Sequence, residues 1–449
     1  MSEPELNVDI PNVAGWPTQS VDSLCSLISR GTAPVYVEHS EVLAIGQRCV
    51  ASTGFAPDFA RPHSHRAMRN VLKPESGDVL LNSTGTGTIG RSVVFNSPGT
   101  FIVDGHVTVM RPRAELADSR WLNSVLRTPA LQRHLERFCF AGSTNQLELS
   151  RTPLRVSRLP TPHIDEQRAM GLVIDTLDTA IHETEAIIAK LKAVKQGLLH
   201  DLLTRGIDAK GEQRPPQVEA PHLYKESPLG WIPREWDAVK LALLVSSIGQ
   251  GWSPDCESRP VDSGSWGVLK TTAITWTGYD DQENKALPPI FKPRPDLEVM
   301  AEDILITRAG PASRVGVVAY VESSREKLMI SDKMYRVRTL PTELPAYIAL
   351  ALSSQVVQVE LGRALSGMAE SQTNISQAIV KNLSVLRPPF EEQFAIVDRV
   401  RTSEGRIREE VESLEKLKAL KAGLMDDLLT GRVRVTPLLA EAVQQRGSD

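Results

Sequence analysis

The sequence predicts an α+β fold: two similar globular units separated by two long helices packed as an antiparallel coiled coil, with a pseudo-twofold internal repeat. The main observation is a stretch that occurs twice, as KLKAVKQGLLHDLLT at 190–204 and KLKALKAGLMDDLLT at 416–430, offset by 416 − 190 = 226 residues. Solenoid repeats run at roughly 20–50 residues, so this period indicates duplication on the scale of a domain. A heptad pattern around each copy and strand-like runs outside them complete the prediction.

Each copy closes a long heptad pattern. Seam residues recur at alternating spacings of three and four, which is typical of the a and d positions of a coiled coil. The first seam is Ile174, Leu177, Ile181, Thr184, Ile188, Leu191, Lys195, Leu198 and Leu202, and the second is Val400, Ser403, Ile407, Glu410, Leu414, Leu417, Lys421, Leu424 and Leu428. Two amphipathic helices packed on separate globular cores are the alternative to a coiled coil.

The helix limits follow from the flanking residues. Pro-rich entries with acidic residues in the first turn favour helix starts, because they suit the fixed proline φ and the helix dipole. We therefore expect helices over about 164–204 and 390–430. Lys195 and Lys421 occupy matching seam positions. A polar seam residue usually fixes the register of the pair at some cost in stability.

Six segments follow along the chain. The order is a first globular unit, a long helix, a polar Pro-rich linker, a second globular unit, a second long helix and a tail, at 1–160, 161–208, 209–222, 223–387, 388–435 and 436–449. Within the first unit, strand-like runs alternate with Gly, Pro and Thr turns at 78–81, 91–95 and 106–110. A helical stretch is expected over about 119–138.

The second globular unit repeats landmarks of the first. The matching pairs are 31–34 with 251–254, 78–81 with 303–306, 89–90 with 315–316, and 143–145 with 372–374. The globular parts differ far more between copies than the helices do. Two similar folds with different surfaces indicate two similar tasks on different targets.

Composition indicates a globular protein of the cytoplasm. The hydrophobic share is 41% and the charged share 24%. No run approaches the roughly 18 apolar residues of a membrane helix, and the acidic N-terminus lacks the core of a signal peptide. The four cysteines, Cys25, Cys49, Cys139 and Cys256, are scattered and form no CxxC pair. This argues against a disulfide framework and a zinc site.

Charge is distributed unevenly. The formal net charge is −4, which by itself would count against nucleic acid as a partner. Basic residues nevertheless outnumber acids between Arg61 and Arg158. A local basic surface is the electrostatic footprint of a nucleic-acid site, so DNA contacts are expected there.

A glycine-rich loop in the first unit is one candidate DNA contact. GTGTIG at 85–90 matches G-x-G-x-x-G, but a strand-like run follows it, whereas a dinucleotide site needs a helix there. The loop is either a hairpin turn or a flexible segment that offers polar side chains to a DNA groove. In the second case the contacts are Asn82, Ser83, Thr84, Thr86 and Thr88, with Arg91 beside them.

Other candidates are basic and amide side chains. In the first unit, Arg61, Arg66 and Arg69 suit phosphate or guanine contacts. In the second unit, Lys270, Arg308, Arg314 and Lys333 are candidates for contacts to the DNA backbone. Amide-bearing segments suit adenine contacts at Thr144, Asn145 and Gln146 and at Gln372, Thr373 and Asn374. Solvated surface charge and turn capping are the respective alternatives.

No catalytic constellation is visible. The chain has no G-x-S-x-G, Walker loop, HExxH or Asn/Asp-Pro-Pro methyltransferase loop. Two histidines at 63 and 65 lack a neighbouring cluster of Asp, Glu or Cys, which argues against a metal site. We therefore expect no catalytic residue, metal or cofactor on this chain.

The whole arrangement resembles the specificity subunit of type I restriction–modification systems. The most specific motifs are QGLLHDLLTRGI, AGLMDDLLTGRV, PPFEEQ, GDVLLNSTGTGTIGR and its counterpart DILITRAG. The resemblance implies that each globular unit is a target recognition domain that reads one half of a split double-stranded DNA sequence. It also implies that the helices set the distance between the halves and dock two modification subunits.

The resemblance assigns the chemistry to other subunits. Modification subunits would bind S-adenosylmethionine and methylate adenine, and restriction subunits would use ATP and Mg to cleave. Docking is expected at the helix ends, at Leu198, Leu199, Leu202, Leu203, Leu424, Met425, Leu428 and Leu429. The alternatives are a self-sufficient methyltransferase or nuclease, a coiled-coil scaffold, and a stand-alone two-domain DNA-binding protein.

Overall fold

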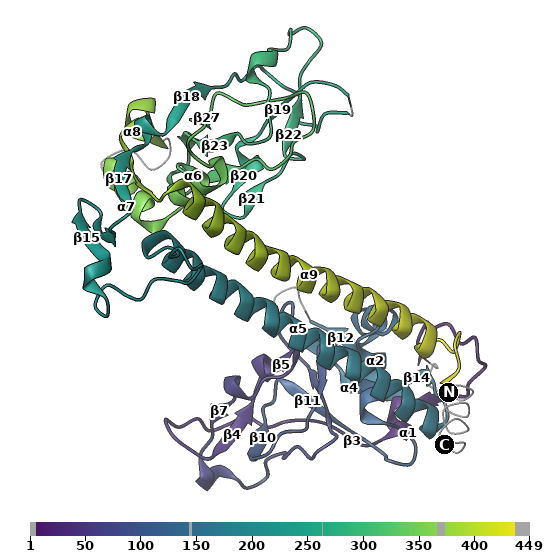
Figure 1. Cartoon of the computed structure of the whole chain (residues 1–449). Coiled ribbons are helices and arrows are strands. Elements are labelled where there is room, and N and C mark those ends of the chain that lie inside the picture. The colour runs from purple at the N-terminus through teal and green to yellow at the C-terminus, as the bar shows by residue number, and fades with distance from the viewer. Residues whose placement is uncertain (1–5, 143–145, 263, 366–372, 436–449) are drawn as a thin grey trace, which may run out of the picture. The chain divides into compact units, whose positions relative to one another are not determined.

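The chain forms two compact units, and each contains part of both long helices. The computed structural model describes residues 6–142, 146–262, 264–365 and 373–435. Unit 1 comprises Met1–Ile188 and Glu409–Asp449, and unit 2 comprises Ala189–Arg408. The long helices are α5 (Ile164–Thr204) and α9 (Phe390–Leu429) (Figure 1). The predicted helix limits are confirmed, but the units divide within the helices rather than at their ends.

Unit 1 is built on an antiparallel sheet in the order β3-β11-β8-β9, with Cys25–Arg30, Val107–Pro112, Val79–Asn82 and Ser92–Val94. A second sheet, β10-β4-β7, joins Thr100–Val103 in parallel to Val42–Ile45, and Val42–Ile45 antiparallel to Arg61–Pro62. The smaller pairings are β1-β14-β2, β5-β6 and β12-β13, at Leu6–Asn7, Ser157–Pro160, Thr18–Ser20, Val50–Ala51, Gly54–Phe55, Phe140–Ala141 and Glu148–Leu149. The short helices α1 to α4 are Val21–Leu24, Ser119–Leu126, Pro129–His134 and Arg151–Val156.

Unit 2 repeats this topology. Its antiparallel sheet has the order β18-β27-β23-β25, with Val245–Gln250, Met334–Thr339, Ile304–Thr307 and Val318–Tyr320. Its second sheet is β22-β19-β26, with Asn284–Ala286, Gly267–Leu269 and Leu328–Met329. The pairs β17-β29, β15-β16, β20-β21 and β24-β28 lie at Asp237–Lys240, Ser384–Arg387, Tyr224–Ser227, Gly230–Pro233, Ile274–Thr275, Gly278–Tyr279, Ala309–Gly310 and Thr373–Asn374.

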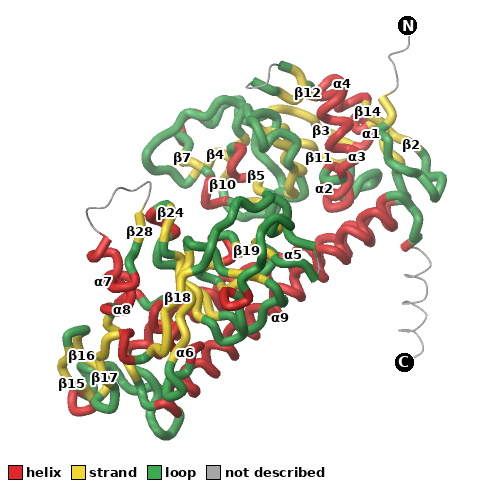
Figure 2. The backbone as a smooth tube through the Cα atoms, turned by 90° about the horizontal axis from the view of Figure 1, so that it is seen from above, coloured by secondary structure: helices red, strands yellow, loops and turns green. Residues whose placement is uncertain are grey.

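The helices of unit 2 also follow the repeat. Helices α6, α7 and α8 are Pro345–Leu352, Gln355–Leu365 and Gln377–Asn382. They occupy the places of α2, α3 and α4, in the same order before a long helix. Figure 2 shows short strands and long loops in the sheet parts of both units. The predicted duplication of the globular parts is therefore confirmed.

The local predictions for unit 1 are largely confirmed. The three strand-like runs form β8, β9 and β11, and a strand, not a helix, follows the glycine-rich loop. The predicted helical stretch over 119–138 is divided in two. Thr128 caps the second helix with its hydroxyl, and Pro129 occupies its first position. Proline has no N–H to continue the first helix, which therefore ends before it.

Equivalent glutamine side chains make similar contacts in the two units. Gln167 Nε2 donates to the carbonyls of Leu116 and Pro162, and its counterpart Gln393 donates to Glu343 and the carbonyl of Pro388. Each glutamine also accepts from a backbone N–H, that of Asp118 or Leu344. These buried amides join the start of each long helix to the short helix packed beside it.

An arginine–aspartate pair is repeated in the main sheets. Arg111 donates to Asp78 at 2.8 Å, and Arg338 donates to Asp303 at 2.7 Å. Both aspartates are only 1% exposed. Buried carboxylates need such partners, so the pair fixes the two main strands in the same way in each unit.

The long helices run antiparallel within each unit. In unit 1, Ile181 and Ile188 of α5 pack with Leu414 of α9, and Lys421 pairs with Asp178. In unit 2, Lys195 Nζ lies 2.6 Å from Glu404. The residue numbers of both ion pairs add to the same value, as antiparallel pairing requires, and the 226-residue offset relates one pair to the other. The two predicted seam lysines thus make equivalent interhelical contacts.

The segment after α5 packs against its own unit, although the sequence predicts a linker at 209–222. Arg214 is buried and donates to both oxygens of Glu392 at the start of α9. Trp236 Nε1 donates to the same carboxylate at 3.0 Å. In unit 1, Arg434 follows α9 and donates to Glu166 of α5 at 2.7 and 2.9 Å. The tail at 436–449 lies outside the described residues.

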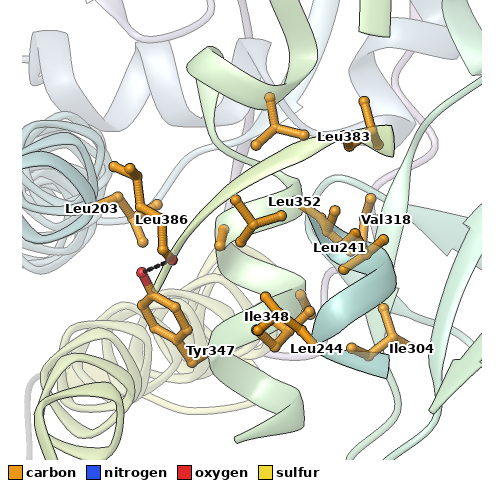
Figure 3. Packing of buried hydrophobic residues seen from close by; sticks show 14 of the residues in the cluster. Leu203, Leu241, Leu244, Ile304, Val318, Tyr347, Ile348, Leu352, Leu383 and Leu386 are labelled. Carbon is orange, nitrogen blue, oxygen red and sulfur yellow. Dashed lines mark hydrogen bonds between the residues drawn. The ribbon is translucent and has the colours of Figure 1, made fainter. Parts of the chain in front are cut away.

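The main core of unit 2 lies between its sheet, its short helices and the ends of the long helices (Figure 3). Tyr347 of α6 is fully buried, and its hydroxyl donates to the carbonyl of Leu386 at 2.9 Å. Leu203 from the last turn of α5 packs into the same cluster. The equivalent core of unit 1 includes Trp121, Leu428 and Leu429. Each long helix thus ends in the hydrophobic core of a unit.

Candidate nucleic-acid interface

Unit 1 has a hollow of about 620 Å³ where several loops meet at one end of its two sheets. Four segments line most of it: the loop after β3, the turn after β4, the start of β7 and the turn before β11. We call it the unit 1 hollow, lined by Arg30, Ala33, Pro34, Tyr36, Ala44, Gly46, Gln47, Arg48, Phe59, Arg61, Asp104, Gly105, His106 and Glu148. Its basic side chains and exposed aromatic rings are typical of a nucleic-acid surface.

Two arginines of the unit 1 hollow lie over aromatic rings. Arg48 Cζ is 4.3 Å from the centroid of Phe59, and Arg61 Cζ is 3.6 Å from the centroid of Tyr36. Both guanidinium groups belong to exposed residues. Across the described part of the chain, neither makes a hydrogen bond or an ion pair. Their donors are therefore available to a ligand.

A buried carboxylate fixes one of these rings. The Tyr36 hydroxyl donates to Asp104 Oδ2 at 3.1 Å, and the backbone N–H of His106 donates to Asp104 Oδ1 at 3.0 Å. Burial and the nearby Asp104 raise the pKa of Tyr36, so the phenol stays protonated and continues to donate. Asp104 thus positions the ring under Arg61.

The polar residues predicted in the glycine-rich segment divide into buried and exposed groups. Asn82 and Ser83 are fully buried and Thr84 nearly so. Asn82 donates to the carbonyls of Gln47 and Val50, and Thr84 bonds to His106 and Gln47. These side chains hold the loops around the unit 1 hollow rather than facing outward.

The other predicted residues of unit 1 lie on the surface. Thr86 is exposed, Thr88 is half-buried, and the exposed basic side chains are Arg66, Arg69 and Arg91. Gln146 is also exposed. Thr144 and Asn145 lie outside the described residues. Among the predicted DNA-contact residues of unit 1 that the structure describes, only Arg61 lines the unit 1 hollow.

The predicted residues of unit 2 differ in their surroundings. Lys270 is half-buried beside Glu283, and Lys333 is exposed. Arg314 donates to the carbonyls of Thr271 and Ile274, so its guanidinium supports the loop. Arg308 donates to the carbonyl of Asp332 and, at 2.8 Å, to Asn374. Thr373 belongs to β28, and Gln372 lies outside the described residues.

Strand register relates the two faces residue by residue. The N–H of Thr32 donates to the carbonyl of Val103, as that of Trp252 does to Ile330. From this anchor and the pairing of β10 with β4 and of β26 with β19, Arg61 corresponds to Lys285 and Arg48 to Thr272. On the same alignment His106 corresponds to Lys333. The equivalent face of unit 2 is therefore also basic, but it carries different side chains.

Several residues of these faces were missed at the sequence level. They are Arg30, Arg48, His106, Lys285 and Arg294. Arg294 Cζ lies 4.2 Å from the centroid of Trp252, which in turn packs edge-on against Phe291. The local sequence does not identify them as site residues. Arg48 and Arg294, for example, each stack on a ring from another segment of the chain, and the two segments meet only in the fold.

The predicted docking residues lie at the ends of the long helices. Leu202, Leu203, Leu428 and Leu429 are at most 6% exposed and belong to the cores of the units. Leu198, Leu199, Leu424 and Met425 are partly buried. Only these four leave side-chain surface for a partner.

In unit 2, Leu199 lines a second hollow of about 760 Å³. We call it the helix hollow, lined by Gln196, Leu199, His200, Leu203, Thr204, Pro228, Leu229, Tyr347, Ala351, Ser353, Ser354, Gln355, Val356, Val357, Val359, Glu360, Arg363, Ser384 and Leu386. Its lining combines apolar and polar side chains, as protein interfaces do.

The thiols are poor candidates for chemistry. Burial raises the pKa of Cys25 to about 12 and that of Cys139 to about 11, which keeps both in the unreactive thiol form at neutral pH. The pKa of Cys49 is also raised, mainly by burial. Among the described residues, no group of three or more His, Cys, Asp or Glu side chains could hold a metal ion. Nor is any described helix long and apolar enough to cross a membrane.

Sequence comparison finds specificity subunits of type I restriction enzymes among the relatives of this chain, although no family model matches. The chain is 40% identical to the type I restriction enzyme EcoEI specificity subunit of Escherichia coli over 47% of its own length, a match that spans 34% of that protein. It is 23% identical to the putative type I restriction enzyme MjaX specificity subunit of Methanocaldococcus jannaschii, over 80% of this chain and 79% of that protein.

Solved structures share the fold. The S subunit of a type I restriction–modification system from M. genitalium aligns over 95% of this chain and 98% of its own, with a TM-score of 0.56 and 12% identity. A chain from a study of complex assembly and conformational transition of the type I R-M system aligns over 95% and 100%, with a TM-score of 0.51 and 17% identity.

Proposed function

This chain is a relative of the specificity subunits of type I restriction systems, and from that premise we propose that it is the DNA-reading, non-catalytic subunit of such a complex. In this role each unit reads one half of a bipartite double-stranded target. The long helices set the gap between the halves and dock two modification subunits. Restriction subunits join the same assembly.

The observation that carries the proposal is the repeat with unequal faces. The framework contacts made by Gln167 and by Arg111 recur in unit 2 at Gln393 and Arg338. In contrast, the basic face exchanges Arg61 for Lys285. A duplicated fold that keeps its framework and changes its basic face is suited to reading two different sequences by one geometry.

The division of labour follows from the chemistry of the side chains. The predicted and observed basic residues can bind phosphate and base edges, but they do not form a nucleophile and base pair of the kind catalysis needs. S-adenosylmethionine would bind to the modification subunits, which methylate adenine, and ATP and Mg to the restriction subunits. The chain would act in the cytoplasm, where its substrate DNA lies.

Docking is proposed at the ends of the long helices. Leu199 and His200 of α5 contribute to the helix hollow, and Val359 of α7 on its wall is 45% exposed. A partner that filled this hollow would contact a long helix and a globular unit together. It would then be held in a fixed relation to the recognition face of that unit.

Methylation by the assembled complex tests the proposal. The chain co-expressed with its modification subunits should direct adenine methylation to one split sequence, and sequencing of modified adenines would reveal it. The chain alone, supplied with S-adenosylmethionine and DNA, should transfer no methyl group. Robust methylation by the pure chain would contradict the non-catalytic role.

The spacer role has its own test. Four residues would be inserted into each helix, between Ile181 and Leu191 and at the equivalent point between Ile407 and Leu417. One extra turn adds about 6 Å, or roughly two base pairs of DNA, and nearly preserves the apolar face. We expect unchanged half-sites and a gap longer by one or two base pairs. An unchanged gap in an active variant would exclude the helices as the ruler.

A further inference from the structure

We propose that the unit 1 hollow reads guanine through Arg48 and Arg61, and that unit 2 reads guanine through Arg294. The inference rests on the proposed function, because it assigns these side chains to the DNA-facing surface of each unit. It adds the chemical class of base that each unit recognises and the residues that recognise it.

The arginines of unit 1 are not equivalent as ligands for DNA. Arg30 pairs with Glu148 at 3.0 Å, Arg111 with Asp78 at 2.8 Å and Arg127 with Asp178 at 3.0 Å. An arginine bound to a carboxylate must lose that partner before it can bind a base. Arg48 and Arg61 have no such partner among the described residues, and both line the same hollow.

Stacking on an aromatic ring orients each of the two guanidinium groups before DNA binds. Phe59 is 46% exposed and Tyr36 is 39% exposed, so each ring offers a face beneath an arginine at the surface. A guanidinium stacked on a ring keeps its in-plane N–H donors free. The ring also restricts the side chain in advance, so less conformational freedom is lost on binding.

The support beneath Arg61 is itself ordered. Tyr36 is held by its hydrogen bond to Asp104, which is 7% exposed and accepts a second bond from the His106 backbone. Asp104 and Tyr36 are positioning residues in this arrangement. A surface arginine used only for general attraction to DNA would not need a buried carboxylate to orient its platform.

The donor pattern selects guanine. In the major groove guanine presents two acceptors, O6 and N7, which match two N–H groups of one guanidinium. Adenine presents N7 beside the N6 donor, so a guanidinium meets one acceptor and one competing donor. An arginine with free in-plane donors therefore discriminates guanine from adenine.

Unit 2 places a stacked arginine elsewhere on the equivalent face. Thr272 and Lys285 stand where unit 1 has Arg48 and Arg61. Instead, Arg294 lies over Trp252, the counterpart of Thr32, and Phe291 packs against the indole. The described residues supply no carboxylate partner for Arg294. Unit 2 therefore contacts its guanine from a different position on the equivalent face.

A plasmid library tests the assignment in the complex assembled with modification subunits. The library holds each single-base variant of the wild-type methylated sequence, and initial methylation rates are measured on all of them. The variants are R48A, R61A and R294A. R133A removes an exposed arginine of unit 1 outside the hollow and serves as the matched control.

We expect a G·C pair in each half of the wild-type target. R61A or R48A should reduce the preference for one such pair in one half by about 5- to 150-fold, the usual range for a bidentate contact. R294A should do the same in the other half, and R133A should leave all preferences intact. Y36F keeps the ring but removes its hydrogen bond to Asp104, so it should weaken the preference partly, whereas Y36A removes the ring and should weaken it more.

Two results would overturn the inference. One is a target half without any G·C pair. The other is a uniform fall in methylation of every library member by R48A, R61A and R294A with unchanged preferences, which marks phosphate contacts. Failure of the wild-type complex to methylate any sequence would instead contradict the proposed function, so the two failures are distinguishable.

Discussion

Unit 1 and unit 2 share a framework and differ at the surface that the framework presents. The shared part includes buried polar groups, such as Asp78 with Arg111 and Asp303 with Arg338. An unpaired buried carboxylate costs several kcal/mol, so neither partner can change alone. Exposed positions such as Arg48 and Thr272 carry no such constraint. Burial therefore separates the positions that determine the fold from the exposed positions that can differ between the two units.

The two units also differ in the ion pair that joins the segment after each long helix to the start of the other long helix. In unit 2 the Arg214–Glu392 pair is buried, with 8% and 9% of the side chains exposed, and Trp236 shares the carboxylate. In unit 1 the Arg434 side chain is 45% exposed on a buried Glu166. The same kind of arginine–glutamate pair is thus buried in unit 2 and partly exposed to solvent in unit 1.

The largest expected effect is the loss of stability when the arginine of one of these two ion pairs is removed. Arg214→Ala leaves Glu392 charged and buried, and should lower the free energy of unfolding by about 3–5 kcal/mol. Arg434→Ala should cost only about 1 kcal/mol, because solvent reaches the pair and can replace the guanidinium. Urea unfolding of both purified variants checks the order. Equal losses of unfolding free energy in the two variants would show that burial does not determine how much each ion pair contributes to stability.

A smaller and symmetrical effect is expected at two glycines. A Cβ on Gly31 would lie 2.0 Å from the carbonyl oxygen of Val103, and one on Gly251 would lie 2.1 Å from that of Ile330. Each Gly→Ala change forces the backbone apart next to the face that we propose binds DNA. It should cost about 1–3 kcal/mol and disturb only the half-site read by its own unit.

Gly249 supplies the control for this pair. A Cβ there would meet its nearest neighbour, the Arg336 carbonyl, at 4.0 Å, so Gly249→Ala should be tolerated. Thermal unfolding and methylation mapping of the three variants provide the measurements. If Gly31→Ala left the first half-site intact despite a stability loss, the loop would not shape recognition.

The smallest expected effect concerns thiol labelling. Cys256 is half-buried, whereas Cys25, Cys49 and Cys139 are buried. A neutral thiol reagent should therefore modify Cys256 before the three buried thiols at pH 8, although burial also raises the pKa of Cys256. The charge of Lys285 lowers the pKa of Cys256 against the larger effect of burial, and Lys285 belongs to the face that we propose binds DNA. Target DNA should slow its labelling in the assembled complex, and an unchanged rate would place DNA elsewhere on unit 2.

The sequence was most informative where local signals and packing agree. Both long helices were predicted to within about one residue, because the heptad seam and the Pro-rich entries specify the same limits. The seam lysines were also predicted, and each finds a carboxylate on the facing helix. The segment around Arg214 was predicted as a linker because it is polar, and its burial depends on a carboxylate far away in the sequence.

The candidate site shows the same limit. Asn82, Ser83 and Thr84 were predicted as DNA contacts from their polar character, yet they are buried and bonded to neighbouring loops. Polarity alone cannot distinguish a groove contact from a loop support. Arg48 was missed because its platform, Phe59, comes from another loop. Such pairs exist only once the sheets have brought the loops together.

The central claim is that each unit reads one half of the target independently. The most direct test replaces residues 1–160 with the corresponding unit of another specificity subunit and maps methylated adenines with the modification subunits present. The account predicts that one half of the methylated sequence changes, while the other half and the gap stay the same. A change in both halves, or a full wild-type sequence retained by the chimera, would contradict it.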